Sequence, residues 1–198
     1  MIIGLTGGIG SGKSVVSRII ESCAVRVVDS DAVAREVIES NSALLPKIRK
    51  LVGAGVFTKS RDLNRPALAK LIFENPEMRR RLERLLHPLI RRRILEEVRV
   101  AKRYKEHLVV TVPLLFEAGF TTPFGEVWVT AAPLKARISR LAARDGISAA
   151  EARRRIRVQM PQSQKIKRAD RVIWTNVPIA TLKARLHKMI NTVLPVPP

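Results

Sequence analysis

Short apolar runs recur along the chain. They are separated by longer stretches in which apolar residues have helical spacing. The runs predict five β-strands, over residues 2–5, 25–28, 108–112, 127–130 and 171–174. The helical pattern follows a glycine cluster after the first run and returns over residues 32–39, 134–144, 149–159 and 179–193. Apolar strands that alternate with helices are typical of a parallel sheet covered by helices on both faces. The pattern therefore predicts a three-layer α/β/α fold with a five-stranded parallel sheet.

The middle of the chain, residues 42–103, departs from this alternation because it holds helical patterns and no convincing strand. Turn signals at Gly53-Ala54-Gly55 and Asn75-Pro76 divide it. We therefore expect residues 1–40 and 106–194 to form the core of an α/β fold and residues 41–105 to form a helical insertion. The tail, residues 195–198, is expected to fray.

Composition limits the classes of protein to which the chain can belong. Apolar residues make up 46% of its 198 residues, but the longest apolar runs are far shorter than a membrane span. Cys23 is the only cysteine, so no internal disulfide can form and a reducing, cytoplasmic compartment is expected. The 37 Lys and Arg residues outnumber the 17 Asp and Glu residues, and the net charge of +20 favours an anionic partner. That partner is a nucleic acid or a phosphate-rich substrate pair, and composition does not decide between them.

The glycine cluster carries the clearest chemical signal. Gly7-Gly8-Ile9-Gly10-Ser11-Gly12-Lys13-Ser14 matches the phosphate-binding pattern G-x-x-x-x-G-K-[ST] and lies between a predicted strand and a predicted helix. Glycines let backbone N–H groups converge on phosphate oxygens, and the following helix directs its positive end at the same place. Lys13 would place its charge on the β- and γ-phosphates of a nucleotide, and the Ser14 hydroxyl would bind Mg²⁺.

A dinucleotide-binding fold is the alternative for this cluster, since Asp29 lies where an acid that binds a ribose would be expected. Its fingerprint, G-x-G-x-x-G, requires a third glycine. Counted from Gly8 and Gly10, that position is Lys13, so the dinucleotide interpretation fails.

More distant segments add a specific likeness. They are Ile3–Ser14, Val28–Arg35, His87-Pro88 after a helix at Leu82-Glu83, Pro113–Glu117, and Arg140–Gly146 followed by Gln159 and Ala169-Asp170. In order and spacing, these segments resemble the dephospho-coenzyme A kinases over about residues 1–190. The resemblance implies a P-loop kinase with a helical substrate-binding insertion and a small helical lid at about residues 135–165.

The same resemblance implies a reaction, in which ATP phosphorylates the ribose 3′-hydroxyl of dephospho-coenzyme A and leaves ADP and coenzyme A. The implied catalytic residues are Lys13, which neutralises the donor, Asp31, which orients and deprotonates the hydroxyl, and Arg140, which screens transferred charge. ATP would bind Gly8, Ile9, Gly10, Ser11, Gly12, Lys13, Ser14, Val15 and Arg144, and the acceptor would bind Asp31, Arg35, His87 and Glu117. Mg²⁺ would rest on Ser14, the ATP phosphates and water, with a carboxylate such as Asp31 nearby.

Each of these roles has a structural alternative. Asp31 could cap a helix, because it precedes Ala32-Val33-Ala34. Arg140 and Arg144 are four residues apart and share a helix face, which could simply be solvated. Arg35 could pair with Glu36 or Glu39 on its own helix, and His87 could pack at a kink, since helices tend to break before a proline.

Two positions depart from the pattern of the family. The third predicted strand ends in Thr111-Val112-Pro113, without the aspartate that many members carry before the proline. Trp174-Thr175 before Asn176 also differs from the commonest pattern, near the expected adenine end of the site.

Two rival functions remain open at this point. One is a kinase of the same fold that acts on a nucleoside or nucleotide. The other is a nucleic-acid-binding NTPase that uses the basic surface between Arg79 and Arg93. Against the second, the chain shows no β-ribbon, zinc-ligand spacing or RNP-like aromatic strand, so non-specific RNA binding is expected at most.

Overall fold

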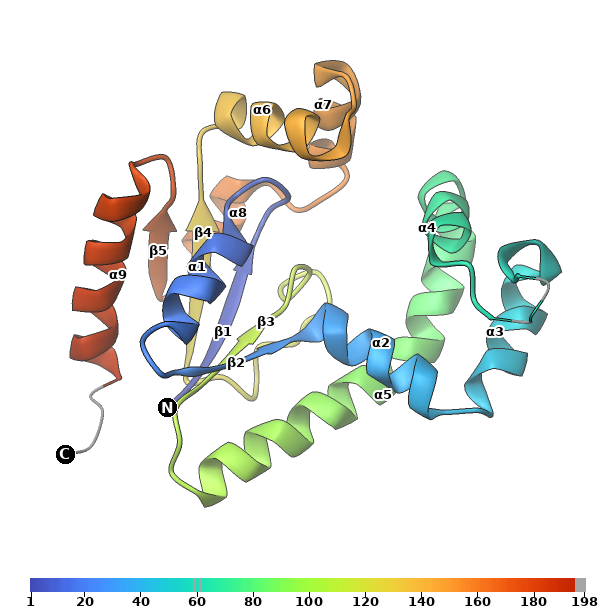
Figure 1. The fold of residues 1–198 in the computed structure, drawn as a ribbon, viewed down its shortest axis with the longest axis horizontal. Helices are drawn as coiled ribbons and strands as arrows, with labels where there is room; N and C mark the ends of the chain where they lie inside the picture. Colours follow the sequence, from blue (N-terminus) through green and yellow to red (C-terminus); the bar gives the residue numbers. More distant parts are fainter. Residues whose placement is uncertain (59, 61, 195–198) are drawn as a thin grey trace. The chain divides into compact units, whose positions relative to one another are not determined.

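A computed structural model describes residues 1–58, 60 and 62–194 (Figure 1). Its strands are β1 (Ile2–Gly7), β2 (Arg26–Asp29), β3 (Leu108–Thr111), β4 (Glu126–Ala131) and β5 (Arg171–Trp174). All the pairings are parallel, and the order across the sheet is β2-β3-β1-β4-β5. The predicted five-stranded parallel sheet is therefore confirmed, whereas the prediction for residues 195–198 lies outside the described residues.

Residues Met1–Ser30, together with the chain from Glu97 onward, form one compact unit. Its helices, apart from the end of α5, are α1 (Lys13–Glu21), α6 (Leu134–Asp145), α7 (Ala149–Arg157), α8 (Gln162–Lys167) and α9 (Ile179–Val193). The bounds of α9 are those predicted, and α7 ends two residues before its predicted end at Gln159. The short helix α8 was not predicted, because its six residues hold Ile166 as their single apolar side chain and show no helical period.

The sheet of this unit is apolar because both of its faces are covered. Every residue of β1 is buried, which explains why this strand reads as a continuous apolar run ending in glycine. In Figure 1, α1 and α9 lie beside the sheet, where Val16 of α1 and Leu186 of α9 pack with Ile3, Leu5 and Trp128. This packing fixes the carboxyl end of β1, where the glycine loop begins.

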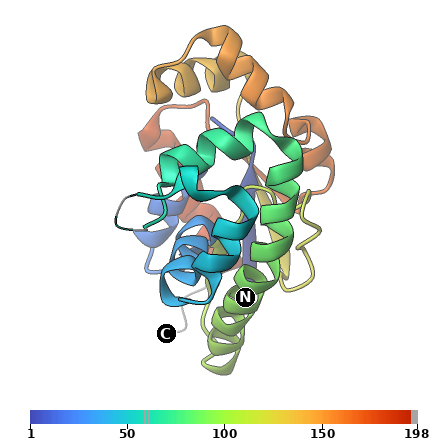
Figure 2. The same cartoon turned by 90° about the vertical axis from the view of Figure 1, so that its right-hand side faces the viewer.

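Residues Asp31–Glu96 form a second compact unit. It contains most of α2 (Ser30–Ser40), α3 (Leu44–Val52), a 3₁₀ turn (Ala54–Val56), α4 (Arg65–Glu74) and the first part of α5 (Pro76–Arg103), which Figure 2 shows from the side. Side chains of all four helices and of the 3₁₀ turn meet in one apolar cluster, which is built on Ile38, Ile48, Val56, Leu68 and Leu82. The expected helical character of this region is confirmed, and an isolated antiparallel bridge joins Phe57 to Leu63.

Helix α5 continues through Pro88, although the sequence favoured a kink or break at this point. A proline inside a helix removes one backbone hydrogen bond and crowds the preceding turn. Leu82, Leu85, Leu86 and Leu89 face the apolar cluster on both sides of the proline, and their burial offsets that loss. Within the described part of the chain, no helix is long and apolar enough to cross a membrane.

Candidate active site

The glycine loop connects β1 to α1 and adopts the turn that its sequence predicts. Gly10 and Gly12 have φ values of 77° and 87°, in the left-handed region that side chains with a Cβ rarely adopt. The Ser11 N–H donates to the Gly8 carbonyl at 3.0 Å and closes the turn. Helix α1 begins at the end of this loop, and a helix N-terminus presents N–H groups and the positive end of its dipole, which bind phosphate oxygens.

Two threonine hydroxyl groups, one at the end of β4 and one just after β5, form hydrogen bonds with Ser11 of this loop. The Ser11 hydroxyl is 2.6 Å from the Thr130 hydroxyl at the carboxyl end of β4, and both are buried. Thr175, which follows β5 and is 4% exposed, donates from its hydroxyl to the Ser11 carbonyl at 2.8 Å. A Cβ at Gly7 would collide with the Thr130 hydroxyl, so this position admits only glycine. The departure noted at Thr175 is therefore a contact with the phosphate loop.

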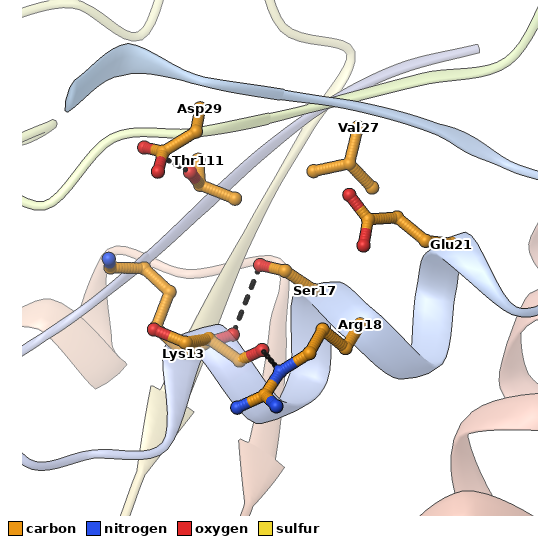
Figure 3. Close-up of a pocket in the computed structure, with 8 residues that line it drawn as sticks. Lys13, Ser17, Arg18, Glu21, Val27, Asp29 and Thr111 are labelled. Atoms are coloured by element: carbon orange, nitrogen blue, oxygen red, sulfur yellow. Dashed lines mark hydrogen bonds between the residues drawn. The ribbon is translucent and has the colours of Figure 1, made fainter. Parts of the chain in front are cut away.

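A pocket of about 220 Å³ opens beside the start of α1. Figure 3 shows Lys13 extending from the helix toward the side of the pocket where Asp29 and Thr111 lie. These last two residues are register partners at the ends of β2 and β3, and the Thr111 hydroxyl donates to Asp29 Oδ1 at 3.0 Å. This arrangement of Asp29 and Thr111 was not predicted from the sequence. The third strand lacks an aspartate, but its threonine orients a carboxylate from the neighbouring strand.

The oxygen donors of this pocket fit a Mg²⁺ ion bound together with nucleotide phosphates. Ser14 and Asp29 both line it, and Mg²⁺ prefers oxygen ligands, of which phosphates and water supply several. Among the described residues, no group of three or more His, Cys, Asp or Glu side chains could hold a metal alone. Asp29 and Glu21 are the carboxylates that share this pocket with Ser14, and Asp29 is the one that the Thr111 hydroxyl orients.

Helices α6 and α7 follow one another closely in the chain (Figures 1 and 2). Gly146 ends α6, and Ser148 caps the start of α7, where its hydroxyl accepts a hydrogen bond from the Glu151 N–H at 3.1 Å. Ile9 of the glycine loop packs against Ile138 and Leu141 of α6. The region predicted as a lid therefore contacts the phosphate loop directly.

The two arginines proposed for this lid have different surroundings. Arg140 donates from Nη2 to the Thr175 carbonyl at 2.7 Å and from Nη1 to the Thr175 hydroxyl at 2.9 Å. It also reaches the Gly10 carbonyl at 3.4 Å. Arg144 instead pairs with Asp145 at 2.7 Å, and its guanidinium lowers the pKa of the Asp145 carboxyl by hydrogen bonding. The structure brings Arg140, but not Arg144, into contact with the phosphate loop.

Two further side chains at this loop were not singled out as site residues from the sequence. Arg137 of α6 is 5% exposed and donates from Nε to the Ile9 carbonyl at 3.0 Å. Gln159 Oε1 accepts from the Ile9 N–H at 2.8 Å. Arg137 directly precedes the apolar Ile138 in α6, but a charged side chain is expected to face solvent. Its burial was therefore not predicted.

Glu117 and Lys165 form an ion pair in which only the lysine is fully buried. Lys165 of α8 is fully buried and lies 2.8 Å from Glu117 Oε1 and 3.0 Å from Oε2. Its ammonium also donates to the Pro113 carbonyl at 3.2 Å, and Glu117 accepts from the Met160 N–H at 3.1 Å. Glu117 was predicted to bind the acceptor, and the structure shows that both its carboxylate oxygens accept hydrogen bonds from the protein.

The remaining predicted residues belong to the second compact unit. Helix α2 begins at Ser30, so Asp31 lies in its first turn and does not precede the helix as a cap would. The carboxylates once considered as partners of Arg35 pair elsewhere: Glu36 with Arg93 at 3.1 Å and Glu39 with Arg65 at 2.7 Å. Arg35 Nε donates to the Asp31 carbonyl at 3.3 Å, and His87 is half-buried in α5.

The parallel sheet, the glycine loop between β1 and α1, and the lysine at the helix start together define a P-loop kinase. The family model for dephospho-CoA kinase matches residues 1–180, and the chain belongs to this family.

Individual relatives agree with this assignment. A curated dephospho-CoA kinase of Bacillus licheniformis is 35% identical, over 97% of this chain and 96% of its own length. A crystal structure from Thermus thermophilus is 35% identical, with a TM-score of 0.80 over 98% of this chain and 97% of that chain. Dephospho-CoA kinase from Campylobacter jejuni is 28% identical, with a TM-score of 0.74 over 97% of this chain and 96% of that chain.

Proposed function

We propose that this chain phosphorylates dephospho-coenzyme A with ATP, which is the last step of coenzyme A biosynthesis. The observation that carries the proposal is the complete phosphate loop with Lys13 at its helix start, in a chain that belongs to the dephospho-CoA kinase family. The acceptor atom is the 3′-hydroxyl of the acceptor's ribose. Its oxygen attacks the γ-phosphorus, the bond to the β-phosphate oxygen breaks, and ADP leaves.

Catalysis of such a transfer consists mainly of positioning and charge neutralisation. Lys13 and the N–H groups of the loop bind the β- and γ-phosphates, with Gly8, Gly10, Gly12 and Val15 shaping the loop. Mg²⁺, when bound with ATP at Ser14 and Asp29, supplies further positive charge to the same phosphates. Arg140 and Arg144 counter the charge that develops on the transferred group, and the loop contacts of Arg140 support its part of this proposal.

Asp31 is proposed as the group that orients the acceptor hydroxyl and takes its proton. It follows Asp29 by two residues in the chain, is exposed, and lies in the first turn of α2. A carboxylate in this role contributes a rate factor of roughly 10²–10⁴. Arg35, His87 and Glu117 are proposed to bind other parts of the acceptor. Arg35 lines a hollow on α2 with Ala32 and Ser40.

The experiment that tests the function is a panel of acceptors with γ-labelled ATP and Mg²⁺. The panel contains dephospho-coenzyme A, adenosine, AMP and a single-stranded RNA. We expect labelling of dephospho-coenzyme A alone, and digestion with a 3′-nucleotidase should release the label and thereby locate the phosphate. Preferred labelling of adenosine or AMP would indicate a nucleoside or nucleotide kinase. ATP hydrolysis that rises with RNA but not with dephospho-coenzyme A would indicate an RNA-dependent NTPase.

A further inference from the structure

Arg137 is a buried cation at the back of the phosphate loop. It is 5% exposed, although Lys135, Ser139 and Arg140 on the same helix are exposed. A Cβ at Gly8 would collide with the Arg137 guanidinium, and a Cβ at Gly10 would lie 2.7 Å from the Arg137 carbonyl oxygen. The loop therefore folds closely around this one residue, and both glycines are needed for the approach.

Arg137 and Gln159 together hold both backbone polar groups of Ile9 in the loop. Ile9 receives a hydrogen bond at its carbonyl from Arg137 Nε, 3.0 Å away, and gives one from its N–H to Gln159 Oε1, 2.8 Å away. The Ile9 side chain is packed against Ile138 and Leu141. With both polar groups of Ile9 engaged, the backbone cannot rotate here without breaking two part-buried hydrogen bonds, and this restrains the orientation of the following N–H groups.

Among the described residues, no carboxylate pairs with the charge of Arg137. No ion pair among residues 1–58, 60 and 62–194 includes it, and its side-chain hydrogen bond goes to a neutral carbonyl. Burial lowers the pKa of its guanidinium, which reflects the cost of keeping this charge away from water. A desolvated cation is stabilised by a nearby anion, and the loop that covers Arg137 is the one whose N–H groups receive phosphate.

We propose that Arg137 is a positioning residue for the nucleotide phosphates. It acts through the Ile9 carbonyl to hold the loop in its phosphate-receiving shape, and its charge adds to the attraction for the polyphosphate. The proposal rests on the proposed function, since it concerns the same nucleotide site. It assigns to Arg137 a contribution to nucleotide affinity, and none to the transfer step.

Three substitutions separate the hydrogen bond from the charge. Arg137→Met removes both, Arg137→Lys keeps the charge, and Arg137→Gln keeps a donor of shorter reach. Arg185→Gln on α9, an exposed arginine away from the loop, is the matched control. The dissociation constant of Mg-ADP is measured by calorimetry on each variant well below its melting temperature, so that only folded protein is titrated.

We expect Arg137→Met to weaken Mg-ADP binding about tenfold, or about 1.4 kcal/mol. Arg137→Lys and Arg137→Gln should lose less, and Arg185→Gln nothing. The kcat at saturating ATP and the KM for dephospho-coenzyme A should stay within about twofold, because affinity lost equally in ground and transition states appears in the KM for ATP.

Wild-type affinity for Mg-ADP in Arg137→Met would overturn the proposal, as would a fall in kcat with unchanged affinity. If Arg137→Met does not fold, the lysine and glutamine variants decide, and wild-type affinity in both would refute it. Since Mg-ADP binding needs no acceptor, a wild-type protein that binds Mg-ADP but does not phosphorylate dephospho-coenzyme A would refute only the proposed function.

Discussion

The buried pair of Lys165 and Glu117 should respond unequally to the loss of either partner. Lys165 has no exposed side-chain area, whereas the Glu117 side chain is 24% exposed. If Lys165 is replaced by Met, Glu117 keeps the Met160 N–H as a donor and can also turn toward water. If Glu117 is replaced by Leu, the ammonium stays fully buried and retains the Pro113 carbonyl at 3.2 Å as its acceptor. The second change should therefore cost more.

The magnitudes follow from these surroundings. Removing one partner of an ion pair so that the other charge stays buried costs about 3–5 kcal/mol, and this range applies to Glu117→Leu, which leaves the fully buried Lys165. For Lys165→Met the remaining acid is partly hydrated, so a loss of about 1–3 kcal/mol is expected, as for a buried acceptor left unsatisfied. The double variant replaces both charges by apolar groups and should lose about 0–1 kcal/mol. In a chain of 198 residues, 3 kcal/mol corresponds to a fall in Tm of about 6–12 °C.

Urea denaturation followed by tryptophan fluorescence measures these losses. Trp128 is fully buried in β4, in the same compact unit as the pair, so its emission reports on the unfolding of that unit. The reasoning is refuted if Glu117→Leu costs no more than Lys165→Met, or if the double variant loses the sum of the single losses. If Glu117 also binds the acceptor, as proposed, the double variant should recover stability while its KM for dephospho-coenzyme A remains high.

Four other substitutions test the nucleotide and acceptor roles by steady-state kinetics and melting temperature. Lys13→Ala should abolish turnover with an unchanged circular dichroism spectrum, and substantial residual activity would remove Lys13 from the phosphate site. Asp31→Asn should lower kcat by roughly 10²–10⁴ at nearly constant Tm, whereas a lower Tm with normal kcat would point to a structural role in α2. Arg140→Ala should lower kcat at least tenfold, about 1.4 kcal/mol, and Arg144→Ala by less, because Arg144 pairs with Asp145. Equal kcat values for both arginine variants and the wild type would exclude both side chains from the transfer step, and would leave Arg140 with its structural contacts to Thr175 and Gly10 alone.

The strands and the long helices were predictable because their signals are local. A continuous apolar run such as residues 108–111 can be buried on both faces only in a covered parallel sheet, and β3 has that position. The bounds of α9 follow from a clear helical period after Pro178. The continuity of α5 through Pro88 did not follow, because it depends on leucines meeting side chains of α2, α3 and α4 in one cluster.

The phosphate loop was predictable for a related reason. Its function depends on backbone geometry that glycine alone permits, and on a lysine at a fixed distance along the chain, so the whole requirement is written in eight consecutive residues. What supports the loop was harder to predict. Thr130, Arg137, Gln159 and Thr175 reach it from positions that are 119 to 164 residues away in sequence, and none of them has a spacing that refers to the loop.

The contact between Thr111 and Asp29 could have been predicted from the order of the strands in the sheet. The missing aspartate on the third strand was seen as a departure that moved metal binding toward Asp31. In a parallel sheet, however, the carboxyl ends of neighbouring strands lie at one edge, so an acid at the end of β2 can occupy the same region as one at the end of β3. Asp29 is the register partner of Thr111 and accepts its hydrogen bond. A predicted strand order of β2 beside β3 would have been enough to name Asp29, in preference to Asp31, as a carboxylate of the pocket that Ser14 lines.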